Sequence, residues 1–127
     1  MNIFDCRFLK TGWLKKLKSK NIEIHARSIF LQGMILSNSC PNYFDKWANN
    51  INNFYKDIEL KNLSALEASI IFINNIREID GVIIGVNNYQ QLVDYNSIKE
   101  KSYLSNILFK DHSVDDENFI NPNNWEI

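Results

Sequence analysis

Side chains and backbone suited to catalysis or ligand binding occur at two predicted strands: along one face of the first strand and in the turn after the second. In the first, Glu23, His25 and Arg27 alternate with apolar residues over residues 22–28, a period of two that sends successive side chains to opposite faces of a strand. Parallel strands in α/β proteins are normally buried on both faces. Three ionisable residues on one face therefore indicate either a face exposed to solvent or the open end of a barrel, where polar active-site residues lie. The pattern leaves both interpretations open.

The second place is a glycine turn between a strand and a helix. A short β-branched run over residues 82–85 ends at Gly85 and is followed by Asn87 and Asn88. Glycine lets a ligand approach the backbone, and the N-terminus of the next helix offers N–H groups to a phosphate. Gly and Asn suit a tight strand-to-helix turn equally well without any ligand. The turn alone therefore does not establish a phosphate site.

The cysteines and histidines form no recognisable catalytic or metal pattern. Cys6 and Cys40 are far apart and lack the CxxC spacing of zinc and redox sites, so we expect no disulfide framework and no metal site. We expect His25 to be a structural, hydrogen-bonded residue. His112 lies in a polar segment, and we expect it to be exposed.

Amphipathic helices are predicted on either side of the first strand. Apolar residues three and four positions apart indicate one helix over residues 8–19, with Trp13, Leu14 and Leu17 on its buried stripe. The same spacing predicts a second helix over residues 44–58.

Two more helices flank the second predicted strand. Ser64 and Glu67 have the S-x-x-E spacing of a capping box, in front of a segment apolar enough to be buried. The other helix is expected over residues 89–98, with an asparagine cap and with Leu92 and Val93 facing inward. Strands alternating with helices predict an α/β fold with a parallel sheet, followed by a charge-rich tail from about residue 99.

Composition limits the class of protein. The 127 residues correspond to about one domain, and a hydrophobic content of 45% excludes a disordered chain. The net charge of −1 provides no global field towards nucleic acid or an anionic membrane, so we expect neither as a partner. The N-terminus lacks a signal-peptide pattern and no apolar run reaches the roughly 18 residues of a membrane span, so we expect a cytoplasmic protein.

Four longer segments of the chain carry a family resemblance: NIFDCRF (2–8), IEIHARSIFLQGMIL (22–36), LSALEASIIFINNIREIDGVIIGVNNYQQL (63–92) and NFINPNNWEI (118–127). They resemble the C-terminal part of the aldo/keto reductase family, and residues 27–33 match the R-S-x-F-L-Q-G motif of some of its members. The resemblance covers essentially the whole chain. It implies a partial TIM (β/α)8 barrel consisting of the last two parallel strands with their helices and a C-terminal tail, about half of the length of that fold.

The resemblance also implies a cofactor site. Such enzymes bind NADPH, or NADH, across the C-terminal mouth of the barrel and transfer a hydride to a carbonyl. The residues that would border the pyrophosphate and nicotinamide side are Arg27, Ser28, Phe30, Leu31, Gln32 and Gly33. Those that would border the adenosine end are Gly85, Val86, Asn87, Gln91 and Asp94.

Three positions depart from the family pattern. Arg27 stands where many members have an aromatic ring that stacks on the nicotinamide, although a guanidinium plane also stacks. Gln91 stands where NADPH-preferring members often place an arginine, and Tyr95 where an asparagine commonly meets adenine. Without a bidentate arginine at position 91, the preference between NADPH and NADH stays open.

The family's acid–base residues would lie upstream of the segments present here. We therefore assign no catalytic residue and expect the isolated chain to be inactive. The leading hypothesis is an oxidoreductase fragment that retains part of the NAD(P)H site. The alternative is a non-catalytic binding or assembly module that oligomerises, or that complements a separately encoded N-terminal half, to cover its open strand edges.

Overall fold

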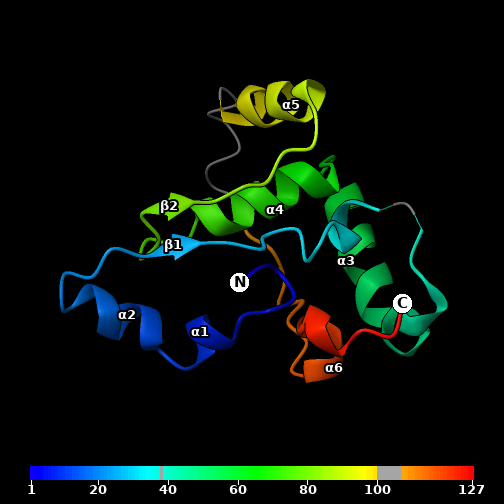
Figure 1. Cartoon of the computed structure of the whole chain (residues 1–127), viewed down its shortest axis with the longest axis horizontal. Coiled ribbons are helices and arrows are strands. Elements are labelled where there is room, and N and C mark those ends of the chain that lie inside the picture. Colours follow the sequence, from blue (N-terminus) through cyan, green and yellow to red (C-terminus); the bar gives the residue numbers. More distant parts are fainter. Residues whose placement is uncertain (38, 100–106) are drawn as a thin grey trace.

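The computed structural model describes residues 1–37, 39–99 and 107–127, so part of the expected charge-rich tail lies outside the described residues. The helices and strands lie around the N-terminal segment (Figure 1). The helices are α1 (Arg7–Lys10), α2 (Trp13–Lys18), α3 (Ala48–Leu60), α4 (Ala65–Asn74), α5 (Tyr89–Lys99) and α6 (Glu117–Ile120). The strands are β1 (His25–Ala26) and β2 (Gly81–Val82), and short 3₁₀ helices cover Met34–Leu36, Asn42–Trp47 and Pro122–Asn124.

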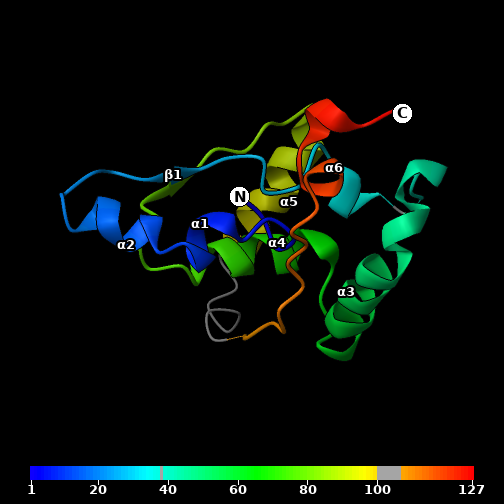
Figure 2. The same ribbon diagram turned by 90° about the horizontal axis from the view of Figure 1, so that it is seen from below.

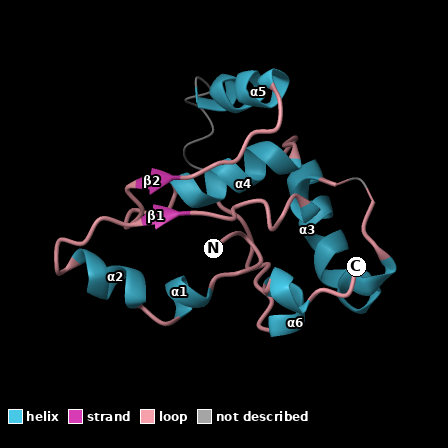
Figure 3. Ribbon diagram, viewed as in Figure 1, coloured by secondary structure: helices cyan, strands magenta, loops and turns pink. Residues whose placement is uncertain are grey.

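The two strands pair in parallel, as the alternation of strand and helix patterns predicted (Figure 3). His25 is opposite Gly81, where a Cβ atom would lie 3.3 Å from the His25 ring. Each strand is two residues long, shorter than the patterns over residues 22–28 and 82–85 indicated, and within the described residues the sheet has these two strands. The barrel remains a prediction.

The charged face of the first strand points to solvent. Glu23, His25 and Arg27 are exposed, Ile24 is half-buried and Ala26 is buried, so the predicted alternation is present from residue 23 on. For Ile22, which is 43% exposed, it was wrong. His25 Nε2 lies 2.7 Å from Glu23 Oε1. In the described part of the chain this face is exposed, as both interpretations require of strands without further neighbours.

The helix predicted over residues 8–19 is divided into α1 and α2. Gly12 adopts a left-handed conformation (φ 72°) between them. Within α2, Leu14 is the buried residue. The prediction for Trp13 was wrong: it is 47% exposed, with Lys16 Nζ 4.4 Å from its ring centroid.

The apolar stripe predicted over residues 44–58 is confirmed. Its first part is 3₁₀ and its second part is α3, and both bury the same face. The buried side chains on this face are Phe44, Trp47, Ile51, Phe54 and Ile58.

The capping box before α4 is also confirmed. Ser64 Oγ accepts a hydrogen bond from the Glu67 backbone N–H at 3.2 Å, and the Ser64 N–H donates to the Glu67 carboxylate at 2.9 Å. This reciprocal arrangement satisfies two helix-end donors. Helix α4 is largely buried, as expected.

The main core joins the two ends of the chain. Phe4 forms edge-to-face contacts with Phe54 of α3 and Phe119 of α6, in both cases with ring centroids 5.3 Å apart. The Val114 N–H donates to the Phe4 carbonyl at 2.8 Å. The turned view also shows the N-terminal segment beside α6 (Figure 2). A second, smaller core joins α2, β1 and α4, and its buried residues are Leu14, Ala26, Ile29, Ile73 and Ile76.

His112 is buried, so the prediction that it is exposed was wrong. Its Nε2 lies 3.0 Å from Asp57 Oδ2, and Lys61 Nζ donates to the other carboxylate oxygen at 2.6 Å. Polar sequence neighbours gave no sign of this partner 55 residues away.

Candidate functional site

A cavity of about 380 Å³ lies beyond the carboxyl ends of β1 and β2. Because the strands are parallel, their following segments, residues 27–33 and 83–88, leave the same edge of the sheet. Gln91 and Tyr95 of α5 complete the wall. This arrangement is typical of ligand sites in α/β proteins.

Eight of the eleven residues expected to border a cofactor line this cavity. They are Arg27, Ser28, Phe30, Gln32, Gly33, Gly85, Asn87 and Gln91. The other three lie elsewhere. Leu31 is buried in the main core, Val86 lines a neighbouring cavity with β2 and α5, and Asp94 lines a groove between α5 and the α3–α4 corner.

The loop after β1 has an unusual backbone. Ser28, Leu31 and Gln32 have positive φ angles of 59°, 46° and 54°, a region that costs free energy for residues other than glycine. Ile29 and Leu31 hold this shape because their side chains are buried in the two different cores. Ser28 and Gln32, on either side of the segment that holds these two buried residues, are exposed and line the cavity.

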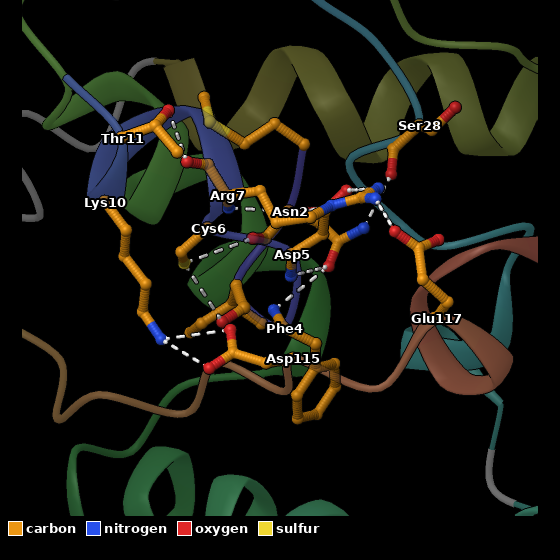
Figure 4. Close-up of polar contacts among 12 residues, drawn as sticks. Asn2, Phe4, Asp5, Cys6, Arg7, Lys10, Thr11, Ser28, Asp115 and Glu117 are labelled. Carbon is orange, nitrogen blue, oxygen red and sulfur yellow. Dashed lines mark hydrogen bonds and ion pairs between the residues drawn. The ribbon is translucent and has the colours of Figure 1, made fainter. Parts of the chain in front are cut away.

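The N-terminal segment supports the same loop through Asn2 (Figure 4). The Asn2 side chain is buried; its Nδ2 donates to the Ser28 carbonyl at 3.2 Å, and its Oδ1 accepts from the backbone N–H groups of Phe4 and Asp5, both at 3.0 Å. This is an Asx turn with one additional long-range bond. The sequence interpretation missed Asn2, although an asparagine ahead of a helix is a common signal for such a turn.

Ion pairs hold the C-terminal segment against this turn. Arg7 Nε donates to Asp5 Oδ1 at 2.8 Å, and its guanidinium also pairs with Glu117. The Arg7 guanidinium lowers the pKa of the Asp5 carboxyl, in opposition to burial, which raises it. Lys10 Nζ lies 3.2 Å from Asp115 (Figure 4). Residues from both ends of the chain thus fix the position of the cavity wall.

Helix α5 begins with a cap that uses cavity residues. Asn88 Oδ1 accepts from the Gln91 backbone N–H at 2.9 Å, which confirms one of the two predicted asparagine caps. Gln91 Oε1 accepts from the Asn87 N–H at 2.8 Å. Two backbone donors at this corner are therefore already bonded within the chain, and an anion here would compete with the Gln91 side chain.

An aromatic pair closes the cavity on its apolar side. The rings of Phe30 and Tyr95 are stacked, with centroids 5.6 Å apart and an angle of 26° between the planes. Burial, and secondarily Asp94, raises the pKa of the Tyr95 hydroxyl. Tyr95 was noted as a departure from the family pattern, but its contact with Phe30 was not predicted, because it depends on how α5 packs.

The chemistry of the cavity suits binding rather than proton transfer. Of the described residues that line it, Arg27 is the one with a charged side chain. The remaining lining consists of amides, the hydroxyls of Ser28 and Tyr95, backbone and apolar groups, and these described residues include no carboxylate or imidazole to act as a general base. A ligand with a planar ring and an anionic group fits this combination.

Metal and thiol chemistry find no support in the described residues. Within residues 1–37, 39–99 and 107–127, no group of three or more His, Cys, Asp or Glu residues is placed to hold a metal ion. Cys6 and Cys40 are free thiols. Burial raises the pKa of the Cys6 thiol to about 11, so it is not a nucleophile at neutral pH. In the same part of the chain, no helix is long and apolar enough to cross a membrane.

The cavity thus combines one positive charge, hydrogen-bonding groups and apolar surface at the carboxyl ends of two parallel strands. Comparisons with models of known protein families, with curated proteins and with solved structures find no match to this chain.

Proposed function

We propose that this chain contributes the C-terminal part of an NAD(P)H-dependent oxidoreductase of the aldo/keto reductase type. One observation carries the proposal: the residues that the sequence resemblance associates with the cofactor come from two separate segments, 27–33 and 83–91, and eight of them line one cavity. Because β1 and β2 pair in parallel, both segments leave the same edge of the sheet, which is where open α/β sheets bind ligands.

In this proposal the chain binds and orients the cofactor but supplies no group that transfers a proton to the substrate. Arg27 supplies the positive charge for a phosphate, and exposed Ser28, Gln32 and Asn87 supply hydrogen-bonding groups. The groups that transfer a proton to a carbonyl come from other barrel strands, and we place the activity in the cytoplasm. When bound, the cofactor supplies the hydride.

Titration of the isolated chain with NADPH tests this assignment. We expect weak binding, because half of the walls of the full site are missing, with no saturation at micromolar NADPH in a fluorescence titration. At millimolar NADPH we expect changes in the ¹⁵N NMR signals of Ser28, Gln32, Asn87 and Gln91. A Gln91→Arg variant should bind NADPH more tightly than NADH, because a guanidinium forms bidentate bonds with a 2′-phosphate.

Gln90→Arg is the matched control, since it adds the same charge one residue away from the cavity lining. Equal effects of the two arginines would indicate a general charge effect. Unchanged amide signals around the cavity at millimolar NADPH would contradict the proposal. If the isolated chain bound NADPH with micromolar affinity, the chain would hold more of the site than the proposal assigns to it.

A second candidate, an assembly module, is favoured by the apolar surface around α5. Five large apolar side chains within eleven residues are exposed: Ile83, Val86, Tyr89, Leu92 and Val93. For Leu92 and Val93 this corrects the prediction that they face inward. Apolar surface concentrated next to a short sheet suggests a covering partner.

Light scattering after size exclusion separates the two candidates. If the chain assembles through this surface, we expect a mass of two or more copies at micromolar concentration, and a monomer for a Leu92→Asp, Val93→Asp variant. A monomer with sharp, cooperative urea unfolding would contradict self-assembly and would weaken the case for a missing partner.

A further inference from the structure

The near-neutral net charge conceals a strong local asymmetry. Residues 6–22 contain six of the fourteen Lys and Arg residues and none of the fifteen Asp and Glu residues. This segment therefore carries a formal charge of +6, and the remainder of the chain carries −7. Such asymmetry is a signal of interaction with an anionic partner even where the overall charge is small.

The fold neutralises half of this charge and leaves the other half exposed. Arg7 and Lys10 pair with acidic residues of the N- and C-terminal segments, and Lys18 Nζ lies 2.7 Å from Asp80. Lys15, Lys16 and Lys20 are exposed and form no ion pair with the described residues.

Two exposed apolar side chains accompany these lysines. Trp13 begins α2 and lies under Lys16, and Ile22 follows α2 in the segment that leads to β1. Both views of the ribbon place α2 and this segment at one end of the long axis of the molecule (Figures 1 and 2). We call this surface the α2 tip, defined as Trp13, Lys15, Lys16, Lys20 and Ile22.

We propose that the α2 tip binds the surface of a membrane rich in anionic lipid head groups. Each lysine near such a surface contributes electrostatic attraction, and tryptophan favours the boundary between head groups and acyl chains. A projecting end of the molecule reaches a flat surface without steric hindrance. Glu23, which follows Ile22 directly, and Asp80, which pairs with Lys18, are the acidic residues beside the tip. At physiological salt the Debye length is about 8 Å, so acidic residues at the other end of the molecule repel the lipid weakly.

Single-stranded nucleic acid fits the α2 tip less well. Its binding to proteins relies on bases that stack on open aromatic faces. Lys16 Nζ already lies 4.4 Å from the centroid of the Trp13 ring, on one of its faces. The inference goes beyond the proposed function and does not depend on it, since it concerns the opposite end of β1 from the cavity.

Vesicle sedimentation with the whole chain tests the inference. The probes are phosphatidylcholine vesicles with and without about 30% phosphatidylserine. We expect binding at millimolar lipid only when phosphatidylserine is present, decreasing as salt rises. Replacing Lys15, Lys16 and Lys20 together by glutamine should lower the partition coefficient on the order of a hundredfold. A Trp13→Phe variant should lose the fluorescence quenching caused by brominated lipid.

The matched control replaces three exposed bases elsewhere, Lys56, Arg77 and Lys110, by glutamine and makes the same change in net charge. This control should bind like the original chain. The proposal is overturned if phosphatidylserine vesicles fail to bind at millimolar lipid, if both triple variants lose binding equally, or if oligo-dT binds more tightly than the vesicles.

Discussion

Replacement of Asp57 by alanine is expected to lower the free energy of unfolding by about 3 to 5 kcal/mol. The Asp57 carboxylate is 3% exposed and bonds to Lys61 through one oxygen and to buried His112 through the other. Removing it leaves a buried imidazole without its acceptor and a half-buried lysine without its counter-ion. Urea unfolding followed by circular dichroism measures the loss.

Helix α3 offers a matched control for this variant. Glu59→Ala removes an exposed carboxylate two residues away and should change the stability by less than about 0.5 kcal/mol. Asp57→Asn should fall between the two, because the amide oxygen still accepts a hydrogen bond but carries no charge. A loss for Asp57→Ala as small as that for Glu59→Ala would show that the buried triad contributes little.

The same carboxylate makes stability depend on pH. Hydrogen bonds from Lys61 and His112 lower the pKa of Asp57 from 3.8 to about 2, against the opposing effect of burial. A lowered folded-state pKa stabilises the fold at pH values above the unfolded-state pKa, and this contribution is lost as the pH falls from about 4 towards 2. The stability difference between the original chain and Asp57→Asn should therefore narrow over that interval.

Local sequence rules predicted the parts of this fold that depend on neighbours in the chain. The i, i+3, i+4 stripe from Phe44 to Ile58, the Ser64 capping box and the start of α5 each require residues within one or two helical turns. Contacts between distant segments were not predictable in this way. His112 is buried against Asp57 of α3, and the α2 stripe buries Leu14 but leaves Trp13 exposed.

The candidate site shows the same division. Sequence motifs identified the two loops, and the parallel pairing of β1 and β2 explains why they meet. The motif could not separate ligand-facing from core-facing positions: Leu31 belongs to the same run as Gln32 but is buried in the main core. The support from Asn2 and the stacking of Tyr95 on Phe30 arise only from tertiary packing.

Replacement of Phe119 by alanine is expected to cost about 4 kcal/mol of stability. The Phe119 ring is fully buried and contacts Phe4 edge to face, and it has similar contacts with Phe44 and Trp47. The cavity left by alanine removes all of these contacts. Phe8→Ala, at an exposed phenylalanine, should change the stability by less than about 0.5 kcal/mol in the same urea experiment.

The effect of Phe119→Ala should also reach the candidate site. Phe4 forms part of the Asx turn through which Asn2 holds the Ser28 carbonyl, so a loosened Phe4 ring weakens the support of the loop after β1. Faster hydrogen exchange at the Phe4 and Leu31 amides is the expected signature, and Phe119→Leu provides a milder variant should the alanine chain fail to fold. If Phe119→Leu destabilises the core while exchange in the loop stays unchanged, the two ends of the chain do not position the cavity, and the loop is held by Ile29 and Leu31 alone.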